Sequence, residues 1–116
     1  MLIFSQKKNF DIFCNIFPRS FPKGQSIEII NSHSFLSIYK NKLNLDEKEH
    51  VTKYFYNRPR NYKIINFKNK KDYSNYNFSV DTLKDFNKTR KILNYLSSKQ
   101  KTINNLINAY DKIFLK

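Results

Sequence analysis

The 116-residue sequence predicts an α/β protein. Short apolar runs of strand length alternate along the chain with longer segments whose apolar residues recur at helical spacing. No internal repeat or low-complexity linker interrupts this alternation. Alternating strands and helices are typical of a layered fold in which helices cover a sheet. Because only two or three short strands are expected, the sheet is thin, and we expect a fold with few strands and several helices.

The first strands lie early in the chain. Residues 10–15 form a short, mostly apolar run that we expect to be a buried strand, and it leads into a loop that carries two prolines. Residues 26–30 surround one carboxylate with β-branched residues and are expected to form the next strand. Asn31 and Ser32 then offer an N-cap. The helix they begin is expected to carry four apolar residues, Phe35, Leu36, Tyr39 and Leu43.

The middle of the chain predicts a further helix and strand. Asp46 and Glu49 resemble a capping box, and we expect the helix they begin to end before Pro59. Its apolar side would carry Val51, Tyr54 and Phe55. Residues 62–67 are expected to form a strand.

The last third predicts one more strand and two helices. Residues 69–77 are expected to be a surface connection, and residues 78–80 a short strand. Thr82 is expected to cap a helix that continues to about Leu96, with four apolar positions, Phe86, Ile92, Leu93 and Leu96. A final amphipathic helix shows a stripe made of Ile103, Leu106, Ile107, Tyr110, Ile113 and Phe114. This stripe needs a surface to pack against.

The composition limits the possible partners. The formal net charge of +13 suggests nucleic-acid binding, but the charge is spread along the chain and lysine greatly outnumbers arginine. Arginine is the preferred residue for bidentate phosphate and base contacts, so we expect no dedicated nucleic-acid protein. Cys14 is the one cysteine, which excludes an intrachain disulfide and fits a cytoplasmic location. No apolar run has the length of a membrane span, and residues 1–8 do not read as a signal peptide.

Asp81 is the first candidate for a functional residue, because it follows the predicted strand at residues 78–80. Open α/β sheets place ligands and metals at the carboxyl ends of their strands. The alternative is structural. Thr82 and Asp85 have the spacing of a capping box, with Asp81 adding negative charge near the positive end of the helix. Residue types alone favour the cap.

Four other side chains are candidates for binding. Arg19 and Lys23 flank a proline-rich loop that could hold an anion at fixed geometry, although such cations are commonly solvated. Glu28 could bind sugar hydroxyls or be an ordinary outward-facing strand residue. His50 could hydrogen-bond a ligand, or pair with Glu47 or Glu49 in a helix. His33 has no comparable support, and the two histidines do not form a zinc pattern.

Three blocks together resemble the C-terminal half of cytidylyltransferases. They are Pro-Arg-Ser-Phe-Pro-Lys-Gly at residues 18–24, Glu-His-Val-Thr at 49–52 and Val-Asp-Thr-Leu-Lys-Asp at 80–85. The nearest groups are those known as spore coat polysaccharide biosynthesis protein F, CMP-KDO synthetase homologue and acylneuraminate cytidylyltransferase. The resemblance extends from about residue 9 to 96. It implies a partial Rossmann-like nucleotide-diphospho-sugar transferase fold in residues 1–96, with a C-terminal amphipathic helix in residues 97–116.

The resemblance also implies roles for these residues. Asp81 would help to hold Mg²⁺, Arg19 and Lys23 would be catalytic anion contacts, and Glu28 and His50 would bind the sugar. Some positions depart from the family pattern. Leu83 and Lys84 replace a Pro-Glu pair, Lys53 replaces a proline, and Ser26 replaces an aspartate.

The implied parent activity is CMP transfer from CTP to an acidic or modified sugar for surface polysaccharide, with release of pyrophosphate. The family's N-terminal phosphate-binding loop has no counterpart in this sequence, and a triphosphate needs such a cradle. We therefore expect a truncated or split enzyme that is inactive alone and depends on a partner chain for the nucleotide-binding half. A homodimer is also possible.

Two alternatives belong to other classes of protein. The chain could be a small basic protein that stacks single-stranded nucleic acid on Tyr54, Tyr56, Tyr73 and Tyr76. It could also be a non-catalytic interaction subunit that pairs with another chain through the apolar stripe of residues 103–114. Most of the aromatic residues are expected to lie in the core rather than on a binding surface.

Overall fold

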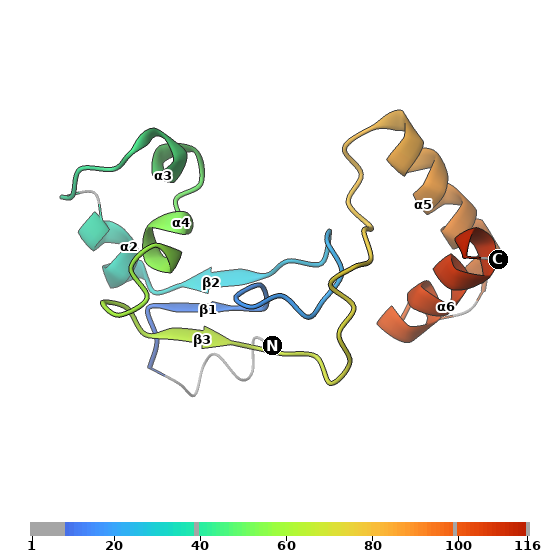
Figure 1. The fold of residues 1–116 in the computed structure, drawn as a ribbon, viewed down its shortest axis with the longest axis horizontal. Helices are drawn as coiled ribbons and strands as arrows, with labels where there is room; N and C mark the ends of the chain where they lie inside the picture. The colour runs from blue at the N-terminus through green and yellow to red at the C-terminus, as the bar shows by residue number, and fades with distance from the viewer. Residues whose placement is uncertain (1–8, 39, 99, 116) are drawn as a thin grey trace. The chain divides into compact units, whose positions relative to one another are not determined.

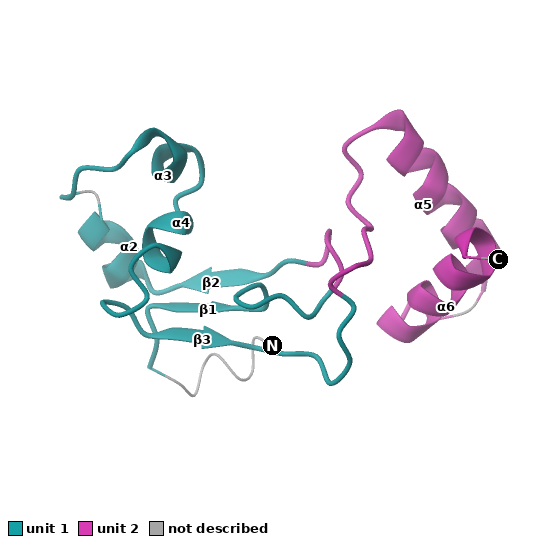
Figure 2. Cartoon of the chain, in the orientation of Figure 1, with its two compact units in different colours: residues 1–21, 26–73 teal, residues 22–25, 74–116 magenta. Residues whose placement is uncertain are grey.

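The structure is a computed structural model that describes residues 9–38, 40–98 and 100–115. Residues 1–8, the basis of the signal-peptide argument, and Tyr39, predicted to lie in a helix, are outside the described residues. The chain forms two compact units, one of residues 1–21 and 26–73 and one of residues 22–25 and 74–116 (Figure 2). In chain order the elements are β1 (Ile12–Cys14), β2 (Glu28–Ile30), α2 (Ser32–Ile38), α3 (Leu45–Glu49), α4 (Lys53–Tyr56), β3 (Ile64–Asn66), α5 (Leu83–Leu96) and α6 (Ile103–Phe114). The predicted α/β class is confirmed.

The first unit holds a three-stranded sheet in the order β2-β1-β3 (Figure 1). β1 pairs antiparallel with β2 and parallel with β3. The register places Ile12 opposite both Ile30 and Ile64, so one apolar row crosses all three strands. The three strands lie within the segments that the sequence predicted at residues 10–15, 26–30 and 62–67.

Helices cover this apolar row. Ile12 forms a buried cluster with Ile38 of α2 and with Tyr54 and Phe55 of α4. Figure 1 shows α2, α3 and α4 gathered near the end of the sheet at which β1 and β3 begin. α2 starts there because the Oδ1 atom of Asn31 accepts hydrogen bonds from the backbone amides of His33 and Ser34. The predicted cap of this helix is thus confirmed.

The helical prediction for residues 46–58 was only partly right, because two short helices replace the single one. The capping box of α3 uses Asn44 and Glu47, not Asp46 and Glu49. His50 then leaves helical geometry, with φ −125° and ψ 77°, which ends α3. α4 begins after Thr52. Leu43, predicted in the preceding helix, lies beyond the end of α2 but still packs against the core of the first unit.

The second unit has no strand at residues 78–80, so that prediction was wrong. The backbone pairing lies just before it, where Lys23 and Asn77 form an isolated parallel bridge. The amide of Lys23 donates to the carbonyl of Tyr76, and the amide of Phe78 donates to the carbonyl of Lys23, both at 2.9 Å. Pairing with one short segment leaves Val80 unpaired and half-exposed.

α5 and α6 pack against each other within the second unit. Ile92 and Leu96 of α5 are buried with Ala109 of α6, and much of the predicted α6 stripe packs around them, namely Leu106, Tyr110 and Ile113. α5 itself therefore supplies a surface for the stripe. Phe86 and Leu93, predicted as apolar positions of α5, are 51% and 40% exposed, because they lie away from this contact.

Candidate functional site

A polar row crosses the sheet next to the apolar row. Cys14 lies opposite both Glu28 and Asn66. Side chains two residues apart on a strand share a face, so these three lie on the same face as Ile12, Ile30 and Ile64. Cys14 and Asn66 end the parallel strands β1 and β3. The polar row is therefore at the strand ends where α/β proteins bind ligands.

Tyr56 holds the carboxylate of this row in place. Its hydroxyl donates a 2.6 Å hydrogen bond to Oε1 of Glu28, and its ring stacks on Phe17 with the centroids 4.8 Å apart. Burial raises the pKa of the Tyr56 hydroxyl far above its usual value of 10.0, and the bond to Glu28 raises it further. Tyr56 therefore stays a donor at physiological pH, and Glu28 is a positioned acceptor rather than a freely solvated strand residue.

Asn66 ties the row to the loop that follows β1. Its Oδ1 atom accepts hydrogen bonds from the backbone amide of Phe17, at 3.0 Å, and from Sγ of Cys14, at 3.4 Å. Its Nδ2 atom donates to the carbonyl of Pro18. Asn66 thus uses both ends of its amide to fix the proline-rich loop against β3.

Arg19 lies in this loop and within the same unit. Its Nη1 atom donates to Oγ of Ser26 at 3.0 Å, two residues before Glu28. In the part of the chain that the structure describes, no acidic side chain forms an ion pair with Arg19. Its guanidinium keeps donors available for an anion.

His50 lies elsewhere in the first unit, in the connection between α3 and α4. Its side chain is 52% exposed, and Nε2 is 3.9 Å from Oε1 of Glu49. The pairing with Glu49 that the sequence offered as an alternative is present. Among the residues that the structure describes, no hydrogen bond or ion pair joins His50 to Glu28, and Tyr56, six residues after His50, is the residue that reaches that carboxylate.

The loop that carries Lys23 belongs to the second unit and packs closely on the segment before Asp81. Gly24 has φ +89°, and a Cβ atom there would lie 2.6 Å from the amide nitrogen of Ser79 and 2.7 Å from the carbonyl carbon of Phe78. Only glycine allows both this left-handed backbone and this approach. The side chain of Lys23 is exposed.

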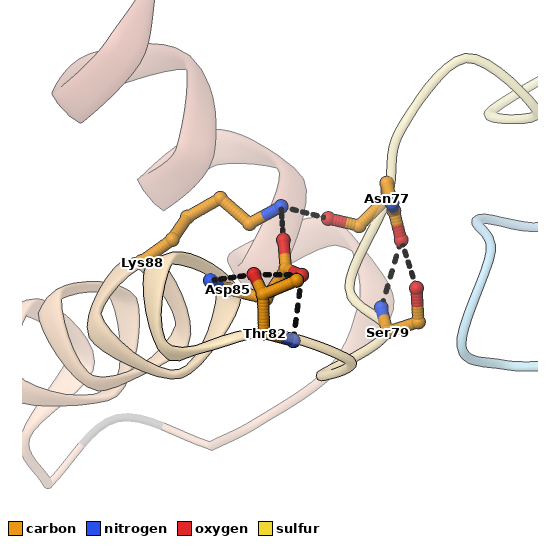
Figure 3. Close-up of polar contacts among 5 residues, drawn as sticks. All are labelled: Asn77, Ser79, Thr82, Asp85 and Lys88. Atoms are coloured by element: carbon orange, nitrogen blue, oxygen red, sulfur yellow. Dashed lines mark hydrogen bonds and ion pairs between the residues drawn. The ribbon is translucent and has the colours of Figure 1, made fainter.

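A hydrogen-bonded network follows this pairing and fixes the start of α5 (Figure 3). Oδ1 of Asn77 accepts bonds from the amide and hydroxyl of Ser79. Lys88 donates to the carbonyl of Asn77 at 2.9 Å and lies 3.5 Å from Oδ1 of Asp85. Thr82 and Asp85 form the reciprocal capping box that the sequence predicted. The bond from Thr82 lowers the pKa of the Asp85 carboxyl.

Asp81 lies in the chain between Ser79 and the N-cap residue Thr82, and its side chain is exposed. The capping box uses Asp85, so the Asp81 carboxylate is not needed for the cap. Mg²⁺ is bound by one or two carboxylates together with phosphate and water oxygens. The exposed carboxylate of Asp81 could be the single carboxylate ligand of such a site. Among the described residues, no group of three or more His, Cys, Asp or Glu side chains could hold a metal by itself.

The five predicted site residues are therefore divided between the two units. Arg19, Glu28 and His50 belong to the first, and Lys23 and Asp81 to the second. Sequence reasoning missed the two residues that position Glu28 and the loop, Tyr56 and Asn66. Asn66 could have been found, since it lies near the end of the strand predicted at residues 62–67, on the same face as Ile64.

The residues of the nucleic-acid alternative are mostly engaged within the protein. Tyr54 is 6% exposed, Tyr56 donates to Glu28, and the Tyr76 hydroxyl donates to Asp111 at 3.0 Å. Arg58 is held by the buried carboxylate of Glu47 at 2.5 Å and lies 3.9 Å from the Tyr54 ring centroid.

None of the described helices has both the length and the apolar character that crossing a bilayer requires.

The fold of this chain has a counterpart among solved protein structures. No family profile matches the chain, and no curated protein sequence matches it. Among solved structures, a cytidylyltransferase from Leptospira borgpetersenii serovar Hardjo-bovis (strain JB197) matches 96% of this chain with a TM-score of 0.83 and 24% sequence identity. The matched region is 47% of that protein, so the chain spans about half its length. The chain has the fold of part of a cytidylyltransferase, as the sequence motifs predicted.

Proposed function

We propose that this chain is one half of a cytidylyltransferase-like protein and forms the sugar-binding side of its cleft. In the complete protein, CMP would pass from CTP to an acidic or modified sugar, and pyrophosphate would leave. The observation that carries the proposal is the fold match, which includes nearly all of this chain but about half of the cytidylyltransferase. It supports a partial Rossmann-like nucleotide-diphospho-sugar transferase fold.

The polar row supports a sugar-binding role in the first unit. A sugar presents several hydroxyl donors in a small volume, and Glu28 is a carboxylate acceptor held by Tyr56. Arg19 lies in the β1–β2 connection, where it donates to Ser26, and would bind an anionic group, such as the carboxylate of an acidic sugar. The role of His50 would require a ligand long enough to reach the α3–α4 connection.

Lys23 and Asp81, both in the second unit, would bind phosphate and metal. Lys23 would bind a phosphate oxygen as a point charge. Asp81 would hold Mg²⁺, which when bound neutralises phosphate charge. The remaining contacts to CTP would come from the other half, on a partner chain. A homodimer and a cytoplasmic location also belong to this proposal.

The proposal predicts that the isolated chain binds acidic sugars through Glu28. A panel of acidic sugars titrated into the chain should include one that perturbs the NMR signals of residues near β2. Glu28→Gln keeps the shape but halves the acceptor strength of the side chain, so binding should weaken by about tenfold. Asp46→Asn, which changes an exposed carboxylate in the same unit, is the matched control and should bind normally.

Equal binding by wild type and Glu28→Gln would remove Glu28 from the site. Failure of every acidic sugar to bind would contradict the proposed sugar-binding role itself.

A further inference from the structure

The second unit has a hollow whose lining includes none of the residues proposed above for binding sugar or phosphate. Residues of α5 and α6 line it, and its volume is about 820 Å³. Cavities that bind small molecules commonly measure 300 to 1,000 Å³. The lining residues are Leu83, Lys84, Asp85, Asn87, Lys88, Lys91, Tyr110 and Phe114.

Part of the hollow is apolar. Leu83 is 76% exposed although it is a large aliphatic residue, and Phe114 is 38% exposed. The Phe114 ring packs on the Tyr110 ring with the centroids 5.2 Å apart. Two neighbouring aromatic rings and an exposed leucine give a ligand an apolar surface on which to bind.

The other part is basic. Lys84, Lys88 and Lys91 follow one another at spacings of four and three residues, which places them along one side of α5. Asp85 is the carboxylate among the lining residues, and its oxygens already accept bonds from Thr82 and pair with Lys88. In the described part of the chain, no acidic side chain forms an ion pair with Lys84 or Lys91. Two ammonium groups at the hollow are therefore uncompensated.

We propose that this hollow binds a small organic phosphate, a molecule that joins an aromatic or aliphatic group to a phosphate. The apolar group would lie on Leu83, Tyr110 and Phe114, and the phosphate would be neutralised by Lys84 and Lys91. The charge selects an anion, and the volume suits a small molecule better than a folded partner. This site is independent of the sugar site around Glu28.

Titration of the full chain with phenyl phosphate, followed by NMR, tests this proposal. Phenyl phosphate should bind about tenfold more tightly than inorganic phosphate, because only it covers the apolar surface. Phenol, which has the ring without the charge, should also bind more weakly. Equal affinity for phenyl phosphate and either fragment would overturn the proposal.

Variants locate the binding. Lys84→Gln combined with Lys91→Gln should weaken phenyl phosphate binding by about fivefold, since each exposed charge contributes modestly. Lys112→Gln, an exposed lysine of α6 outside the hollow, is the matched control and should change little. The lysines are on the surface, so the NMR spectrum should show that the variants remain folded. A double variant that binds like wild type would also overturn the proposal.

Two further compounds distinguish a nucleotide from a lipid phosphate as the ligand of the hollow. Tighter binding of adenosine monophosphate than of octyl phosphate would assign the hollow to a nucleotide. The reverse order would assign it to a lipid phosphate. Either order supports an organic phosphate site, and failure of both compounds to bind contradicts it.

Discussion

At the scale of single residues, the bond between Tyr56 and Glu28 is the contact that turns a strand residue into a candidate ligand group. Glu28 opens β2, which is the edge of the sheet, and its carboxylate could otherwise rotate into solvent. The hydrogen bond from the Tyr56 hydroxyl removes much of that rotational freedom, and the two polar groups that form it are half-buried. A group fixed before its ligand arrives loses less entropy on binding.

Tyr56→Phe should reduce the stability of the protein by about 1 kcal/mol at neutral pH, because Glu28 loses its donor while the ring is kept. The pKa of Tyr56 is raised in the folded state, so its contribution is complete below the unfolded value of about 10.0. It is lost as the pH rises above that value, since the unfolded chain then loses a proton that the folded chain retains. Denaturant unfolding between pH 8 and pH 11 measures both effects.

The variant should therefore lose less stability than wild type over the alkaline range, and the two curves should converge. Tyr110→Phe, which removes a hydroxyl from α6 and keeps the ring that packs on Phe114, is the control. Parallel curves for wild type and Tyr56→Phe would show that the hydroxyl is not buried against Glu28.

At the scale of elements, the start of α5 depends on a cap and on the segment before it. The Thr82 side chain accepts from the Asp85 amide, and the Asp85 side chain accepts from the Thr82 amide. Lys88 joins this cap to the carbonyl of Asn77. The direction in which α5 leaves the loop is thus set by three polar side chains, those of Thr82, Asp85 and Lys88, in the first two turns of the helix (Figure 3).

Thr82→Ala should destabilise the second unit by about 1 kcal/mol, the usual effect of losing an N-cap. The pKa of Asp85 is lowered in the folded state, mainly by its bond from Thr82. The contribution of Asp85 is therefore present above its unfolded value of 3.8 and is lost as the pH falls through the folded value. Thermal unfolding at pH 7 and at pH 3 should show a larger difference at pH 7.

Ser98→Ala changes a hydroxyl beyond the end of α5 and should leave the melting temperature near that of wild type. A Thr82→Ala protein as stable as this control would mean that the cap contributes nothing in solution.

Local patterns in the sequence predicted these elements better than distant ones. Thr82 and Asp85 are three residues apart, so their spacing alone identified the cap. The box at α3 was missed by two residues because Asp46 is also a good cap residue, and only the structure shows Asn44 in that position. The pairing of Lys23 with Asn77 joins segments more than fifty residues apart, and no local pattern marks it. The prediction of a strand at residues 78–80 was wrong for the same reason, because the backbone pairing in this region depends on a segment far away in the sequence.

At the scale of the whole molecule, the chain has the fold of part of a larger enzyme. The motifs predicted this resemblance because they lie in order along the chain, and the fold match confirms it. They did not predict which contacts position the site, since Tyr56 and Asn66 belong to no motif. The formal net charge of +13 gives the chain a general attraction for anions. It does not by itself make a nucleic-acid surface, because Arg58 is paired with Glu47 and Tyr54 is buried in the first unit.

The isolated chain should release no pyrophosphate from CTP in the presence of Mg²⁺ and candidate sugars. Among the described residues, no group of three or more His, Cys, Asp or Glu side chains could hold a metal, and Asp81 alone is too little to hold a triphosphate and its metal. A coupled pyrophosphate assay measures this, with the Leptospira cytidylyltransferase as the active control. Turnover by the purified chain above the rate without protein would refute the proposal that it is a half.

The second unit is discontinuous, and this bears on how the protein can be divided. Residues 22–25 belong to it, although they lie between two segments of the first unit. A cut after Tyr73 would leave residues 74–116 without the strand partner of Asn77 and without the glycine packed on Ser79. Residues 1–73 would still contain the whole of the first unit, whereas residues 74–116 would be an incomplete second unit. A protease, a fusion junction or a permuted terminus at that position would therefore damage the second unit, even though the break lies between the two units in the sequence.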